Sequence, residues 1–191
     1  MVVDEAVSTT EPDWNREAKR FFEWAPSRSL LGAIRSYQLH AAGGAMGGLA
    51  RRWAVLRHRF WSAVTGADIP LTSNIGGGLL LPHPNGVVIH PGSVIGPNCL
   101  LFHQVTLGFG TGGVPTLGGG VDVGAGAKII GSINVGDRAI VGANAVVLED
   151  VPAGATVAGV PARVIAQRKV MPRRSAAPPK KPRTQPARRR K

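Results

Sequence analysis

Cysteine and aromatic residues are scarce in this chain of 191 residues. Cys99 is the single cysteine, so an intramolecular disulfide cannot form. Five phenylalanines and one tyrosine stand against 26 glycines and 15 prolines, a balance that is unusual for a packed α/β enzyme and indicates many tight corners. No apolar run approaches the ~20 residues of a membrane span, and no signal peptide opens the sequence. We therefore expect a soluble, cytoplasmic protein.

Acidic residues are missing from two long segments, Ser27 to Thr65 and Arg168 to Lys191. The second segment holds eleven lysines and arginines, so most of the formal net charge of +12 lies there. Because it is also rich in proline and poor in apolar residues, we expect a basic disordered tail over residues 166–191. Such a tail either binds polyanions, such as nucleic acid or anionic membrane, without specificity or serves only to solubilise the chain.

The part of the chain before residue 67 divides into two segments. Residues 1–24 are polar and acidic and predict an arm or a short helix. Residues 25–66 carry apolar side chains at steps of three and four, which predicts a helical lead-in of two helices. The glycine-rich stretch from Gly43 to Gly48 is expected to break them.

Residues 67–165 follow a different period, because an aliphatic residue returns at every sixth position. Thirteen residues obey this rule: Ile69, Ile75, Leu81, Ile89, Ile95, Leu101, Leu107, Leu117, Val123, Ile129, Val135, Val141 and Val147. A second column, four residues further on, is mostly small or aliphatic. A fixed short period is typical of repeat proteins, in which each unit stacks on its neighbours and buries a continuous apolar interior. The spacing therefore predicts a β-helix of hexapeptide repeats.

The period is interrupted twice. The step from Leu81 to Ile89 is two residues too long, and the step from Leu107 to Leu117 is four residues too long. Insertions in repeat proteins form loops, and loops often carry function. These two segments are therefore the first places to look for a site.

Five motifs in this region match one family of enzymes. They are GADIP (residues 66–70), HPNGVVIHPGSVIGPN (83–98), QVTLG (104–108), VGAGAKIIGSINVG (123–136) and AGVPARV (158–164). The segment from Asp68 to Val164 resembles the serine O-acetyltransferase branch of the hexapeptide-repeat acyltransferases. The resemblance implies a mainly β fold, a left-handed parallel β-helix with three six-residue rungs per coil. It also implies a homotrimer that binds acetyl-CoA as co-substrate, without a metal, in the groove between subunits.

Three rungs per coil place residues eighteen apart directly above one another, once the inserted residues are subtracted. His83 and His103 then occupy the same position in successive coils, about 4.8 Å apart along the backbone. The same column continues through Ala125 and Ala143. Imidazole suits proton transfer near neutral pH, and alanines leave room for a thin pantetheine arm. The histidine end of the column is therefore expected to carry the reaction, and the alanine end is expected to bind the cofactor.

The resemblance assigns a role to each of these residues. His83 corresponds to the general base that removes the proton of the acceptor hydroxyl, and Asp68 to the acid that orients this imidazole. His103 either contacts the substrate or fills a corner. The acceptor oxygen attacks the thioester directly, so Cys99 is not needed; its place in the inward column predicts a buried thiol.

Cofactor binding is expected at two places. A loop of Gly110, Thr111 and Gly112 resembles the glycine-threonine loop beside the thioester in this family. Ala125 and Ala143 match positions that line the pantetheine arm.

The residues that grip serine in the family are not all present. Pro82 stands where an Asp normally lies beside the catalytic histidine, and the loop at Gly112 to Pro115 supplies no arginine for a carboxylate. Three functions therefore stay open: acetylation of L-serine in cysteine biosynthesis, acetylation of a sugar hydroxyl, and a non-catalytic scaffold with a polyanion-binding tail. The short helical segment favours a trimer over a hexamer. The basic C-terminus predicts no complex with cysteine synthase.

Overall fold

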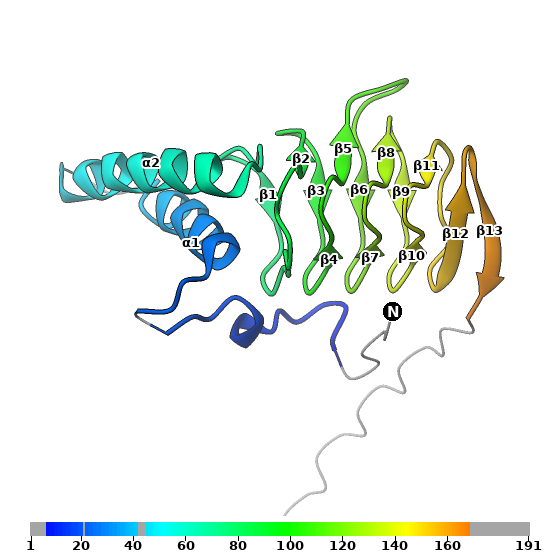
Figure 1. Cartoon of the computed structure of the whole chain (residues 1–191), viewed down its shortest axis with the longest axis horizontal. Coiled ribbons are helices and arrows are strands. Elements are labelled where there is room, and N and C mark those ends of the chain that lie inside the picture. The colour runs from blue at the N-terminus through cyan, green and yellow to red at the C-terminus, as the bar shows by residue number, and fades with distance from the viewer. Residues whose placement is uncertain (1–6, 21, 42–44, 169–191) are drawn as a thin grey trace, which may run out of the picture.

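Two helices lead into a stack of short strands in the computed structural model of the chain, which describes residues 7–20, 22–41 and 45–168 (Figure 1). A single 3-10 turn, η1 (Trp14–Arg16), precedes the helices α1 (Pro26–Leu39) and α2 (Ala45–Thr65). None of the helices in this described part is long and apolar enough to cross a lipid bilayer. The helices lie at one end of the stack, and α2 extends along its long axis.

The strands form three sheets that run along the stack as the sides of a prism. Sheet 1 contains β1 (Asn74–Ile75), β3 (Val94–Ile95), β6 (Thr116–Leu117) and β9 (Asn134–Val135). Sheet 2 contains β4 (Leu100–Leu101), β7 (Asp122–Val123), β10 (Ile140–Val141), β12 (Ala155–Gly159) and β13 (Ala162–Gln167). Sheet 3 contains β2 (Val88–Ile89), β5 (Thr106–Gly108), β8 (Lys128–Ile130) and β11 (Val146–Val147). The chain visits the sheets in turn, so the predicted parallel β-helix after a short helical segment is confirmed.

The six-residue period is explained by burial. All thirteen residues of the first column are at most 6% exposed, and they face the interior of the prism. The second column is buried as well, from Ser73 and Ser93 at one end to Val151 at the other. Each coil therefore contributes its inward side chains to one continuous apolar core, and no coil could bury them without its neighbours.

Strand pairing within this body is parallel except at its last element. β13 turns back and pairs antiparallel with β12, which ends the coil. This closing hairpin was not predicted from the sequence. The described chain continues to Arg168, and the predicted tail lies outside the described residues from position 169 onward.

Two corners of the prism use one residue per coil with a left-handed backbone. Between sheets 2 and 3, Gly86 and Gly126 alternate with Gln104 and Asn144, all with φ between 56° and 73°. This backbone turns the chain sharply, and glycine adopts it without the cost that a Cβ brings. A side chain at Gly86 would also lie 3.1 Å from Gln104 in the next coil.

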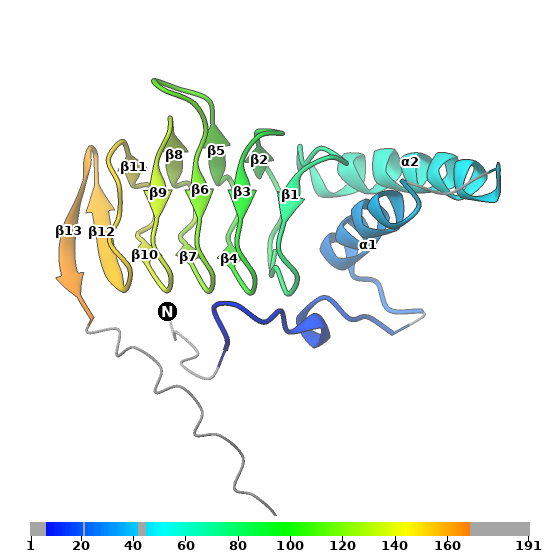
Figure 2. The ribbon, with the colours of Figure 1, turned by 180° about the vertical axis from the view of Figure 1, so that it is seen from behind.

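The N-terminal arm, residues 7–20, lies along the corner between sheets 1 and 2 (Figure 2). Asn98 holds it there: its side-chain oxygen accepts from the amide of Asp13, and its side-chain nitrogen donates to the carbonyls of Ser8 and Glu11, each at 2.8 Å. Arg138 also donates to the carbonyl of Val7 at 2.9 Å. The arm was expected from its composition, but its docking was not.

Two glycine triplets make room for this arm. A Cβ at Gly119 would lie 1.9 Å from the carbonyl oxygen of Thr9, and one at Gly77 would lie 2.7 Å from the Trp14 ring. Both distances are far below van der Waals contact. The sequences GGG at 76–78 and 118–120 therefore form a track without side chains.

The break between the helices is shorter than the sequence suggested. α2 begins at Ala45, so Gly47 and Gly48 lie in its first turn and not in the connection. Glycine is unfavourable in a helix by only about 1 kcal/mol relative to alanine, and packing of α2 on α1 outweighs this cost. The expectation of a break from Gly43 to Gly48 was wrong at its C-terminal end.

The first coil is tied to the arm and to α1 by an ion pair. Arg35 of α1 binds Glu17 of the arm at 2.9 Å and also donates to the carbonyl of Gly76 at 2.8 Å. Glu17 in turn accepts from the amide of Leu79 at 3.0 Å. These contacts fix the helical segment on the end of the β-helix.

Candidate functional site

The corner between sheets 2 and 3 carries the four residues of the predicted column, and we call it the histidine corner. Leu80 pairs with Leu100, Leu101 with Val123, and Val123 with Val141. Counting forward in this register aligns His83, His103, Ala125 and Ala143 in four successive coils. Backbone hydrogen bonds agree, since Gly126 donates to the carbonyl of His103 at 2.9 Å.

The two imidazoles lie next to each other on the surface of the described chain. Their ring centroids are 6.2 Å apart and the ring planes meet at 75°, an edge-to-face arrangement. Both side chains are exposed, as is Ala143, whereas Ala125 is half-buried. A reacting group placed beside the pair could contact both rings.

Asp68 lies one coil before this pair, at the edge of sheet 3. Its backbone pairs with Val88, accepting from Ile89 at 3.0 Å and donating to Val87 at 2.8 Å. The insertion after Leu81, which carries His83, leads directly into this pairing partner. Within the described residues no hydrogen bond joins the Asp68 carboxylate to His83. The register places Asp68 opposite Val88, five residues after His83, and the orienting role of Asp68 stays a prediction.

The four-residue insertion forms a tight loop between β5 and β6, which projects from the stack (Figure 1). Gly110 and Gly113 exchange backbone hydrogen bonds of 2.9 and 3.2 Å. Gly112 and Gly113 have φ of 78° and 141°, which glycine adopts most easily. Thr111 and Gly112 are exposed at the tip.

This loop and the histidine corner lie on either side of β5. The loop follows β5, whereas His103 precedes β5, so sheet 3 lies between them. A strand rises about 3.3 Å per residue, so the three residues of β5 alone separate the two features by about 10 Å. The histidine corner and the loop of one chain therefore lie at opposite ends of β5.

Three side chains near these features were not anticipated as a group. Phe109, at the start of the loop, is 69% exposed and lies 6.0 Å from the His90 ring. Lys128 stands on the outer face of sheet 3, and its ammonium donates to the carbonyl of Gln104 beside His103. No spacing rule marks Phe109 or Lys128, because both are outward residues that the six-residue period leaves open.

Cys99 has no nucleophilic role in this arrangement. It is fully buried in the second column, where its thiol donates to the carbonyl of Gly118 at 3.2 Å. Burial raises the pKa of this thiol to about 12, so almost no thiolate exists at neutral pH. The predicted buried thiol is confirmed.

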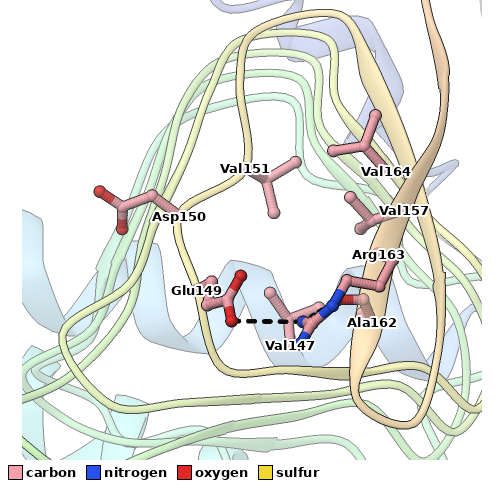
Figure 3. Close-up of a pocket in the computed structure, with 8 residues that line it drawn as sticks. All are labelled: Val147, Glu149, Asp150, Val151, Val157, Ala162, Arg163 and Val164. Carbon is pink, nitrogen blue, oxygen red and sulfur yellow. Dashed lines mark hydrogen bonds and ion pairs between the residues drawn. The ribbon is translucent and has the colours of Figure 1, made fainter.

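Within residues 7–20, 22–41 and 45–168, no group of three or more His, Cys, Asp or Glu side chains could hold a metal ion. A hollow does open at the last coil, where Val147, Val151 and Val157 form an apolar floor (Figure 3). Arg163 and Glu149 form an ion pair of 3.3 Å across it. None of the predicted site residues lines this hollow.

Comparison with curated proteins gives a consistent result, although no protein-family model matches the chain. A serine acetyltransferase of Helicobacter pylori is 49% identical over 107 residues, which is 53% of this chain and 62% of that protein. A serine acetyltransferase of Mycobacterium tuberculosis is 41% identical over 128 residues, 64% of this chain and 56% of that protein. Over 107 to 128 residues, the chain is thus similar in sequence to serine acetyltransferases.

Solved serine acetyltransferases share the fold as well as the sequence. The enzyme of Brucella abortus in complex with coenzyme A is 34% identical, with a TM-score of 0.64 over 75% of this chain and 57% of that one. A serine acetyltransferase in complex with cysteine is 32% identical, with a TM-score of 0.64 over 85% of this chain and 64% of that one. The chain thus spans little more than half the length of these serine acetyltransferases.

Proposed function

We propose that this chain is an acetyl-CoA-dependent O-acetyltransferase, with the hydroxyl of L-serine as its acceptor. The similarity to serine acetyltransferases, one of them solved with coenzyme A, carries the proposal. The adjacent imidazoles of His83 and His103 support it, because they offer proton-transfer groups at one exposed corner.

The reaction needs one base and no covalent intermediate. Nε2 or Nδ1 of His83 takes the proton of the acceptor hydroxyl while the oxygen attacks the thioester carbonyl carbon. The tetrahedral intermediate then collapses, the C–S bond breaks, and the His83 imidazolium returns the proton to the departing sulfur. His103, one coil away, contacts the acceptor or the thioester. Asp68 orients the His83 ring from the preceding coil.

Acetyl-CoA binds along the rest of the histidine corner. Ala125 and Ala143 continue the column beyond His103, and their methyl groups leave a shallow path for the pantetheine arm. Gly110, Thr111 and Gly112 contact the thioester end. Because this loop lies on the other side of sheet 3 from the histidines of its own chain, it comes from a neighbouring copy, and the active assembly is a homotrimer.

Complementation tests this shared site. His83→Ala removes the base, and Gly112→Val forces a β-branched side chain into a backbone with φ of 78°. Each variant alone should be inactive. Co-assembly of the two variants should recover activity, because some sites combine an intact histidine corner with an intact loop; mixtures that stay inactive would contradict the shared site.

A sugar hydroxyl is the second candidate acceptor. Pro82 is exposed directly beside His83 and offers neither a charge nor a backbone donor for the ammonium of serine. The loop after Gly112 also lacks an arginine for the serine carboxylate. Release of free CoA should be measured with L-serine, homoserine and a panel of sugars. Turnover with L-serine supports the first proposal, activity on sugars alone replaces it, and no turnover at all contradicts both.

A further inference from the structure

One face of α2 exposes six large apolar side chains. They are Met46, Leu49, Trp53, Leu56, Phe60 and Val64, each between 42% and 90% exposed. Their spacing of three and four residues places them on one side of the helix over its whole length. The opposite side packs on the rest of the protein, since Ala54 and Thr65 are buried there. We call the six residues the α2 stripe.

Arginines flank the α2 stripe on both sides. Arg52 and Arg59 each come one residue before a ring of the stripe, and both are exposed. Arg57 comes one residue after Leu56 on the other side and is half-buried. No acidic residue occurs from Ser27 to Thr65, so neither helix supplies a counter-charge.

This charge pattern disfavours a second copy of α2 as the partner. In a parallel coiled coil, the residue that precedes an apolar position on one helix faces the residue that follows the next apolar position on the other helix. Arg52, which precedes Trp53, would then face Arg57 of the second helix, which follows Leu56. An antiparallel pair would place Arg52 against Arg59. Like charges at such positions destabilise the pair, and no acid in α1 or α2 offsets the repulsion.

An anionic lipid surface complements the same pattern. A helix with Trp, Phe and Leu on one face and arginines beside it lies in the interface of a membrane, with the apolar face buried and the cations near the headgroups. We propose that α2 docks the protein onto membranes that contain anionic lipid, through the α2 stripe and its flanking arginines. α2 extends beyond the β-helix, so a flat surface can reach it (Figures 1 and 2).

Docking would also fix where the histidine corner lies. α2 ends at Thr65, three residues before Asp68. The site would then lie close to the membrane surface. This inference does not depend on the acceptor or on the reaction proposed above.

Vesicle flotation with the full-length chain tests the proposal. Vesicles are made from phosphatidylcholine alone or from an equal mixture with phosphatidylglycerol. The variant carries Trp53→Ser and Phe60→Ser. Its matched control carries Val160→Ser and Ile165→Ser, which change side chains that are 72% and 67% exposed at the other end of the β-helix. All four positions are exposed, so the fold should survive, and circular dichroism checks it.

We expect the wild type to bind the mixed vesicles and not the neutral ones. The stripe variant should bind at least about tenfold more weakly, because two large apolar side chains no longer enter the interface. The control should bind like the wild type. Bromine-labelled lipid should quench tryptophan fluorescence in the wild type, and Trp53→Phe should remove most of that quenching without loss of binding.

Two results would overturn the proposal. If the stripe variant binds as well as the wild type and tryptophan is not quenched, the basic tail alone attracts the vesicles. If the stripe variant has a lower oligomeric mass than the wild type by light scattering without lipid, the α2 stripe is buried between copies of the chain.

Discussion

Replacing Asn98 should loosen the N-terminal arm, and the structure gives the size of the effect. Asn98 is 2% exposed, and its side chain makes three hydrogen bonds of 2.8 Å, with Asp13, Ser8 and Glu11. A neutral hydrogen bond contributes about 1 kcal/mol net, so the three together contribute at most about 3 kcal/mol. Once the arm is released, its polar groups can form hydrogen bonds with water, which offsets part of this loss. We therefore expect Asn98→Gly to lower the free energy of unfolding by about 2 kcal/mol.

Glycine is the right replacement because Asn98 has a φ of 60°, where any other residue would add strain. Asn144→Gly is the matched control: it has a φ of 56°, is exposed, and lies at the other corner, away from the arm. Urea unfolding measures both variants, and trypsin cleavage after Arg16, which is half-buried and donates to the carbonyl of Asn98 at 2.6 Å, reports release of the arm. If the two variants unfold within about 0.5 kcal/mol of each other, the Asn98 side chain does not anchor the arm.

Three further predictions concern buried groups. Because burial raises the pKa of the Cys99 thiol to about 12, iodoacetamide should leave Cys99 unmodified in the native protein and react only after unfolding; rapid native labelling would contradict this. Burial also raises the pKa of Asp122 above its ordinary value, although Arg16 partly opposes the shift. As pH rises, Asp122 therefore loses its proton in the unfolded chain before it does so in the folded protein. The folded protein is fully stable with respect to this group below the unfolded pKa, and it loses stability as pH rises from there through the folded pKa. Asp122→Asn should thus stabilise the protein at pH 7 but not at pH 3, as measured by denaturant unfolding; equal effects at both values would contradict the burial cost. Leu101→Ala should lower the free energy of unfolding by about 3 kcal/mol, because Leu101 is fully buried in a middle coil; a change below about 1 kcal/mol in thermal unfolding would contradict close packing there.

The β-helix could be predicted from the sequence because one rule repeats in every coil. An inward side chain every sixth residue leaves a pattern that thirteen positions share, from Ile69 to Val147, and their burial follows from it. The alignment of His83 with His103 followed as well, since only the inserted residues had to be subtracted.

The docked arm and the closing hairpin left no comparable pattern. Asn98 and the triplet at 118–120 look like ordinary turn residues, and only the structure shows that a second segment crosses them. β13 is not part of the repeat, so the six-residue period does not predict it. The proposed contact of the Gly110 to Gly112 loop with a second copy could not be predicted from the period either, because such a contact would depend on outward residues that the inward period does not constrain.

Acetyl transfer by His83→Ala is the most direct test of the central proposal. The rate of CoA release should fall about a hundredfold or more relative to the wild type, because general bases usually contribute at least that factor. His40→Ala serves as control, since His40 lies at the end of α1, away from the histidine corner, and should keep the wild-type rate. A loss of less than about tenfold in folded His83→Ala would show that His83 is not the base.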